Sequence, residues 1–80
     1  MDTNNSLQEI EQLHKKIGQN VKQIREKKGM TQLELSQAIG HKTTTILSQA
    51  ELGKNKHFNI EQLYKISQVL NCDLCDFFQL

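Results

Sequence analysis

The sequence lacks several features that mark common classes of protein. Its 80 residues include no proline and no tryptophan, one tyrosine, three phenylalanines, two cysteines and four glycines. No apolar run approaches the roughly 20 residues that span a bilayer, and no secretory signal segment is recognisable. We therefore expect a cytoplasmic protein that has no contact with a membrane.

Patterns that carry chemistry are scarce as well. No Ser-His-Asp arrangement, nucleophile elbow, phosphate-binding loop or carboxylate pair is evident, so an enzyme is not expected. Cys72 and Cys75 form a CxxC pair, but a structural zinc needs two further ligands and a thioredoxin-like site needs a preceding strand. We expect core or incidental thiols, with zinc binding and redox sensing as the alternatives. No metal, cofactor or small-molecule ligand is expected.

The net charge is small, but the charges are unevenly distributed. Ten Lys and Arg against nine Asp and Glu give a formal net charge of +1, which argues mildly against a strong electrostatic binder of nucleic acid. Basic residues nevertheless gather between positions 15 and 28 and between 42 and 56, while most acidic residues lie towards the ends. We expect a domain with one moderately basic face.

Apolar spacing and capping residues predict an all-α fold. One apolar stripe with steps of three and four could continue to about residue 28; its members are Leu7, Ile10, Leu13, Ile17, Val21 and Ile24. Capping boxes, a Ser or Asn followed three residues later by Glu or Gln, begin at Ser6 and Asn59. We expect five helices around one core, with residues 1–16 as a polar tail and helical extension and residues 17–80 as the domain.

The clearest local pattern lies between residues 31 and 53. Thr31 and Glu34 form another capping box, so a helix should begin at Gln32, and Gly40 can end it in the left-handed conformation.

A second short helix should follow over about 43–52 and end at Gly53. Its inner face would consist of Leu47, Ala50 and Ile46. Two short helices joined by a tight connection that contains glycine are the sequence form of a helix-turn-helix.

From about residue 17 to residue 78 the sequence resembles the Xre/Cro-like helix-turn-helix DNA-binding domains of phage repressors and bacterial regulators. The ordered residues that carry the resemblance are Ile17, Gly18, Arg25, Gly29, Met30, Thr31, Gln32, Glu51 and Gly53. The connection between the two motif helices is one residue longer than is usual, with His41 and Lys42 where the family has one apolar residue. The resemblance implies a sequence-specific transcriptional regulator that places its second motif helix in the major groove of double-stranded DNA.

The resemblance and the charge pattern assign roles to individual residues. The base-reading positions are Thr43, Thr44, Thr45, Ser48 and Gln49, and the phosphate-binding positions are Gln32, Lys42, Lys54, Asn55 and Lys56. Glutamine can bond two edge atoms of adenine, and threonine methyls suit the thymine methyl group. Arg25 and Glu51 stand where the family has an internal ion pair that orients the recognition helix.

A regulator of this kind is expected to bind operator half-sites as a homodimer. Two surfaces away from the recognition helix are candidates for the dimer interface. One comprises Phe77 and Leu80, which are expected to extend past the last core residues, Leu74 and Phe78, and the other comprises Leu7, Ile10 and Leu13. The alternative function is a protein-interaction module, similar to an antitoxin or anti-repressor subunit, with weak or no DNA binding. The low net charge and the longer connection favour that alternative.

Overall fold

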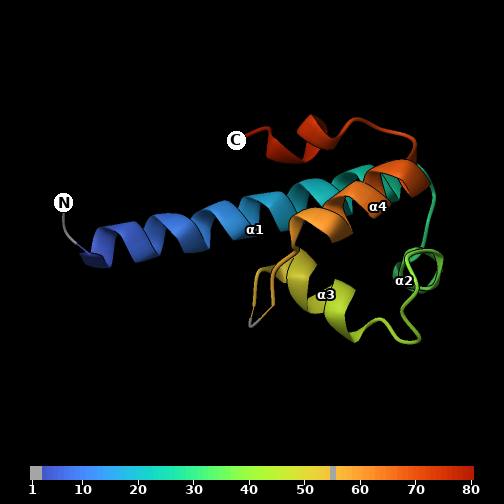
Figure 1. Cartoon of the computed structure of the whole chain (residues 1–80), viewed down its shortest axis with the longest axis horizontal. Coiled ribbons are helices and arrows are strands. Elements are labelled where there is room, and N and C mark those ends of the chain that lie inside the picture. Colours follow the sequence, from blue (N-terminus) through green and yellow to red (C-terminus); the bar gives the residue numbers. More distant parts are fainter. Residues whose placement is uncertain (1–2, 55) are drawn as a thin grey trace.

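The part of the chain that the structure describes folds into four α-helices followed by a short 3-10 helix (Figure 1). The computed structural model describes residues 3–54 and 56–80, with side chains from Ser6 onward. The elements are α1 (Thr3–Lys27), α2 (Gln32–Ala38), α3 (Thr45–Leu52), α4 (Ile60–Leu70) and the 3-10 helix η1 (Leu74–Phe78). No strand occurs among the described residues. The all-α prediction is confirmed, but the fifth expected helix is 3-10 in character.

Helix α1 dominates the shape of the molecule. Its 25 residues correspond to about 37 Å at the usual rise per residue, which accounts for the longest dimension of 41 Å. The helix is continuous through Gly18 and begins before Ser6, so the capping box predicted at Ser6 is wrong. Its N-terminal half extends beyond the other helices (Figure 1). No helix in the described part of the chain is both long enough and apolar enough to cross a membrane.

The helices end where the sequence permits a left-handed residue. At the end of α2 the N–H of Gly40 donates to the Gln37 carbonyl and the N–H of His41 donates to the Ser36 carbonyl, at 3.1 and 2.8 Å. This paired pattern requires positive φ, which is 93° at Gly40. Asn71 takes the same role after α4 with φ of 54°, as its sequence position predicts.

The core lies between the C-terminal half of α1 and the four shorter elements. Its buried apolar members are Ile17, Val21, Leu35, Ile39, Leu47, Ala50, Phe58, Leu63, Ile66, Leu70 and Phe77. The expectation that Phe78 is buried and Phe77 is exposed is wrong, because Phe77 is 0% exposed and Phe78 is 37% exposed. In a 3-10 helix residues three apart share a face, so Leu74 aligns with Phe77, whereas an α-helix would pair it with Phe78. Phe77 therefore cannot contribute to a dimer interface without unfolding of the core.

Candidate nucleic-acid interface

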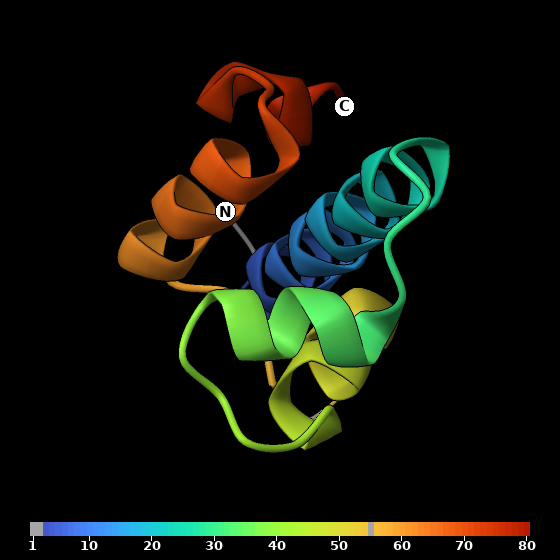
Figure 2. The same cartoon turned by 90° about the vertical axis from the view of Figure 1, so that its right-hand side faces the viewer.

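Helices α2 and α3 form the helix-turn-helix, and α1 packs against the inner side of α3 (Figure 2). The capping box at the start of α2 is present: the N–H of Glu34 donates to Thr31 Oγ1 at 3.0 Å and the N–H of Thr31 donates to the Glu34 carboxylate at 2.9 Å. The bond from the Thr31 N–H and, second, the Thr31 hydroxyl lower the pKa of the Glu34 carboxyl, since both favour its charged form. Local residues therefore fix where α2 begins.

Helix α3 turns one face to the core and the other to solvent. Leu47 and Ala50 are completely buried, whereas Thr45 is exposed and both Ser48 and Gln49 are half-buried. Within the described chain the Gln49 side chain makes no hydrogen bond, so both its donor and its acceptor remain available to a partner.

Two of the predicted base-reading residues precede the helix. Thr44 occupies the N-cap position without a side-chain capping bond, and Thr43 lies one residue earlier. The hydroxyls of Thr43 and Thr45 are 3.4 Å apart, and Ser48 Oγ donates to the carbonyl of Thr45 at 3.1 Å. The five residues thus lie within the first five residues of α3 and the two residues just before it.

Two apolar side chains on this outward face were not assigned to it from the sequence. Ile46, which was expected on the inner face, is 39% exposed, and Leu52 is 58% exposed. Successive residues of an α-helix are rotated by about 100° around its axis, so Ile46 is rotated by that angle from both Thr45 and Leu47. It therefore lies at the boundary between the exposed face and the buried face of α3. The packing of α3 on α1 turns that boundary outward. An exposed isoleucine beside Thr45 adds an apolar surface that suits a thymine methyl group.

The ion pair expected between Arg25 and Glu51 is present and buried. Arg25 Nε donates to one carboxylate oxygen of Glu51 at 2.8 Å and Arg25 Nη2 donates to the other at 3.1 Å. The two residues are 6% and 2% exposed. Hydrogen bonding to Glu51 raises the pKa of Arg25 further above its usual value. This bidentate contact fixes the C-terminal end of α3 against α1.

Gln32 and Met30 extend the same network. Gln32 Nε2 donates to Glu51 at 2.9 Å, and Arg25 Nη1 donates to the Met30 carbonyl at 2.7 Å. A glutamine amide carries two N–H groups, so one of them stays available for the phosphate contact that the sequence predicts for Gln32. The network thereby links α1, the start of α2 and the end of α3.

The basic residues that flank α3 are on the surface. Lys42, Lys54 and Lys56 are all exposed, whereas Asn55 lies outside the described residues. Phe58 is buried at 7% exposure and attaches the loop after α3 to the core, a role that the sequence did not indicate.

A pair of histidines holds this loop against α1. The rings of His14 and His57 stack with centroids 3.8 Å apart and planes 13° from parallel. Burial and, second, the proximity of His57 lower the pKa of His14 below its usual value. The hollow around the two rings is lined by Glu11, Lys15 and Lys56. One carboxylate and two lysine ammonium groups therefore surround the histidine pair.

This stack makes folding stability depend on pH. Because the folded state lowers the His14 pKa, the unfolded chain binds more protons, and stability falls as pH drops below the ordinary histidine value of about 6.5. We expect a lower thermal midpoint at pH 5.5 than at pH 7.5, and a smaller difference between the two in His14→Gln. Calorimetry at both pH values measures this, and an unchanged pH difference in the variant would exclude a role for the stack.

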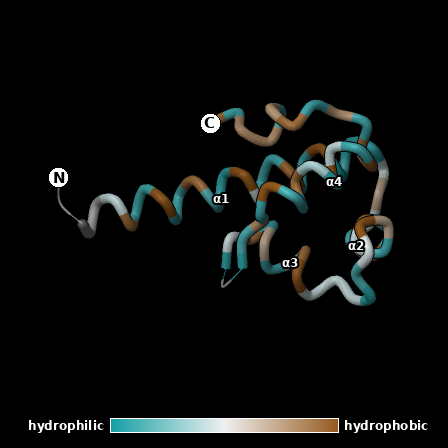
Figure 3. The backbone as a smooth tube through the Cα atoms, in the orientation of Figure 1, coloured by the Kyte–Doolittle hydropathy of each residue, from teal (hydrophilic) through white to brown (hydrophobic). Residues whose placement is uncertain are grey.

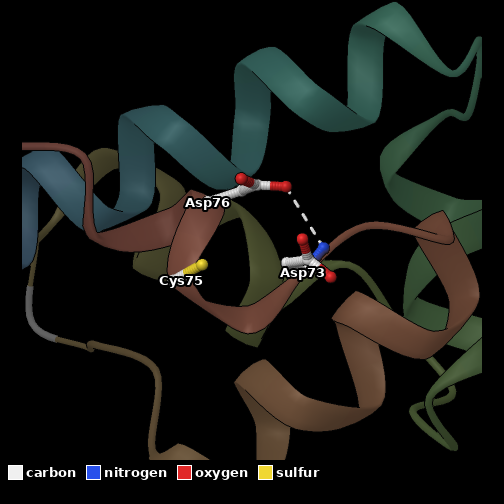
Figure 4. Close-up of side chains that lie close together, drawn as sticks. All are labelled: Asp73, Cys75 and Asp76. Carbon is white, nitrogen blue, oxygen red and sulfur yellow. Dashed lines mark hydrogen bonds between the residues drawn. The ribbon is translucent and has the colours of Figure 1, made fainter.

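One group of possible metal ligands lies away from α3. Ligand atoms of Asp73, Cys75 and Asp76 lie within 4.8 Å of one another on η1 and the residue before it (Figure 4). The Asp76 carboxylate already accepts the Asp73 N–H at 3.1 Å, which is a local turn contact. Cys72 is absent from this group and packs against the core, and burial raises the pKa of its thiol. Of the two CxxC residues, only Cys75 therefore belongs to this group of possible metal ligands, and both cysteines are free thiols.

Comparisons with known proteins agree with this geometry. No curated protein matches the chain significantly. The model of the helix-turn-helix family matches residues 21–77, which include α2, α3 and α4 completely and leave out the projecting half of α1. This match covers more than half of the chain and includes the buried Arg25–Glu51 pair. The chain belongs to the Xre/Cro-like helix-turn-helix family, whose domains bind DNA.

Proposed function

We propose that this chain is a sequence-specific transcriptional regulator that binds double-stranded DNA through α3 and occupies operator half-sites as a homodimer. The observation that carries the proposal is the form of α3. Its inner face is fixed by the core and by a buried ion pair, and its outer face carries Gln49, whose side chain makes no hydrogen bond within the described chain. Membership of a DNA-binding family supports the same reading.

The charge distribution supports contact with the DNA backbone on both sides of α3. Lys42 is exposed before the helix, and Lys54 and Lys56 are exposed after it. When a recognition helix enters the major groove, residues that flank it approach the phosphates at the edges of the groove. A net charge of +1 is then no obstacle, because the cations are concentrated where the phosphates lie.

The side chains of α3 favour half-sites rich in A·T pairs. Gln49 can bond N6 and N7 of an adenine, and the methyl groups of Thr45 and Ile46 suit thymine. The described residues of α3 and of the preceding connection include no arginine, which is the usual two-point partner of guanine.

Replacement of Gln49 by alanine should change sequence preference more than affinity for DNA in general. The first step is selection of a preferred site from a pool of random duplexes. On that site we expect Gln49→Ala to lose about 1–3 kcal/mol, with little change on random duplex, because only base contacts carry sequence information. Gln68→Ala, which removes an exposed glutamine of α4, is the matched control. Equal losses on both kinds of DNA would remove Gln49 from the base-reading residues.

The flanking lysines should show the opposite behaviour. We expect Lys54→Gln and Lys56→Gln to weaken binding to all duplexes by similar factors and to reduce the salt slope by about 1 for each phosphate contact. Fluorescence anisotropy at several salt concentrations measures both quantities. A protein that binds neither random nor selected duplex at low salt would instead favour the protein-interaction alternative, in which the exposed apolar residues of the N-terminal half of α1 bind a partner.

A further inference from the structure

The projecting half of α1 carries an apolar stripe that the rest of the described chain does not cover. Leu7, Ile10 and Leu13 are 56%, 49% and 37% exposed, although they continue the same stripe as Ile17, which is 6% exposed. Figure 3 shows the apolar bands continuing along α1 beyond the other helices. Three large apolar residues in register on one exposed helix face are typical of a surface that another helix covers.

The C-terminal segment extends this surface. The buried Asn20 amide donates to the carbonyls of Phe77 and Gln79, both at 3.0 Å, and so holds the end of the chain along α1. Leu80, which is 76% exposed, lines a shallow hollow together with Glu9, Gln12, Leu13 and Lys16. The apolar stripe and the tail therefore form one continuous patch, which we call the α1–tail patch (Leu7, Ile10, Leu13 and Leu80).

The charges beside the patch identify what covers it. Glu9 and Lys16 line the same hollow and lie seven residues apart, which places them on one side of the helix two turns from each other. A second α1 that runs antiparallel, with Ile10 of each copy beside Leu13 of the other, places each Glu9 next to the other copy's Lys16. In a parallel two-fold pair the corresponding flanks of the two helices lie on opposite sides of the contact, so neither Glu9 would reach the other copy's Lys16. The patch is thus self-complementary under a two-fold rotation, as an isologous interface requires.

We infer that the α1–tail patch is the homodimer interface, in which the projecting halves of α1 from two copies pair antiparallel. Glu9 and Lys16 of opposite copies flank the apolar contact and select the antiparallel direction. The same pair of charges disfavours a partner helix that lacks the reversed pattern.

This arrangement leaves the DNA-facing side of the molecule open. In Figures 1 and 2, α3 and the C-terminal segment lie on opposite sides of α1, and both contact it. A dimer built on the tail side therefore does not cover the outward face of α3. The inference rests on the proposed homodimer, but the association can be measured without DNA.

Sedimentation equilibrium of the purified chain tests the apolar part of the interface. We expect a monomer–dimer equilibrium with a dissociation constant of about 10 µM, since a contact of roughly four helical turns is smaller than a standard interface. Ile10→Glu should raise that constant more than tenfold, because it places a charge at the centre of the patch. Gln8→Glu adds the same charge on the far side of α1 and should leave the constant unchanged. Circular dichroism checks that both variants stay folded.

Charge reversal tests the identity and direction of the partner. Glu9→Lys and Lys16→Glu each put like charges together in a homodimer, so each variant alone should sediment as a monomer at concentrations where the wild type is dimeric. In a mixture of the two variants both cross-pairs have opposite charges, so heterodimers should form with near wild-type affinity. The chain that carries both changes should again form homodimers.

The outcomes separate this inference from the proposed function. A wild type that stays monomeric at several hundred micromolar, or two variants that fail to associate when mixed, would overturn the antiparallel interface. Single half-site duplexes report DNA binding independently, and Ile10→Glu should bind them as the wild type does. A wild type that dimerises but does not bind half-site duplexes would contradict the proposed function and leave the inferred interface intact.

Discussion

Replacement of Glu51 by glutamine should lower the free energy of unfolding by about 3–5 kcal/mol, because it leaves the buried Arg25 guanidinium without its counter-charge. Glutamine and glutamate have nearly the same size and shape, so the substitution creates no cavity. The loss of stability therefore comes from the missing charge and the weaker hydrogen bonds. The carboxylate of Glu51 accepts two bonds from Arg25 and one from Gln32, and all three donors would face a neutral amide. Denaturant titration of Glu51→Gln measures the loss.

The matched control is Glu61→Gln, which removes an exposed carboxylate in the first turn of α4. It should cost no more than about 1 kcal/mol, the usual size of a helix-dipole contribution. A domain of this size has a total stability on the order of 4–12 kcal/mol, so the Glu51 variant could be largely unfolded at room temperature. Equal effects of the two substitutions would show that the buried pair contributes no more than a surface charge.

A double-mutant cycle separates the pair from its surroundings. Arg25→Met combined with Glu51→Leu removes both charges, and apolar replacement of a buried pair is often close to neutral. The Met30 carbonyl would still lose its bond from Arg25, so a residual cost of about 1–3 kcal/mol should remain. We expect the double variant to lose clearly less stability than the sum of the losses in Arg25→Met and Glu51→Leu alone. A loss equal to that sum would exclude direct coupling between the two side chains.

Gly18→Ala should destabilise the domain by about 3 kcal/mol, although helix propensity alone would make the same change stabilising by about 1 kcal/mol. A Cβ at this position would lie 2.7 Å from the Glu51 carbonyl oxygen and would also clash with the carbonyl oxygen of Ala50. Those atoms are α3 backbone, so they cannot move aside without displacing the whole helix. The expected fall in thermal midpoint is on the order of 15 °C.

Gln19→Ala provides the control for this substitution. Gln19 is the next residue of α1 and is exposed, so alanine there should be neutral or slightly stabilising. A Gly18→Ala variant with an equal or higher thermal midpoint would mean that α1 and α3 are not in backbone contact. Such a result would also remove the support on which the orientation of α3 depends.

The elements set by neighbouring residues were predictable from the sequence. The capping boxes at Thr31 and Asn59 each involve residues three apart, so a short pattern is sufficient to specify them. The left-handed ends at Gly40 and Asn71 likewise depend on the residue type at one position. The Arg25–Glu51 pair spans α1 and α3, and the family resemblance was what indicated it.

The features that were missed depend on tertiary packing. The burial of Phe77 instead of Phe78 follows from the 3-10 geometry of η1. The amino-acid sequence does not distinguish this geometry from a short α-helix. Asn20 interrupts an apolar stripe and was not singled out, because its two acceptors lie 57 and 59 residues further along the chain. The stacking of His14 on His57 and the outward turn of Ile46 similarly depend on contacts between distant segments.

The most direct test of the central claim is an NMR titration of the labelled chain with its selected duplex. The account predicts that the largest changes in backbone amide shifts occur at residues 42–49 and at Lys54 and Lys56, with smaller changes on α4. The projecting residues 7–13 should change little beyond their response to dimerisation. Unchanged amides in α3, or changes confined to the α1–tail patch, would contradict the assignment of α3 as the DNA-reading helix.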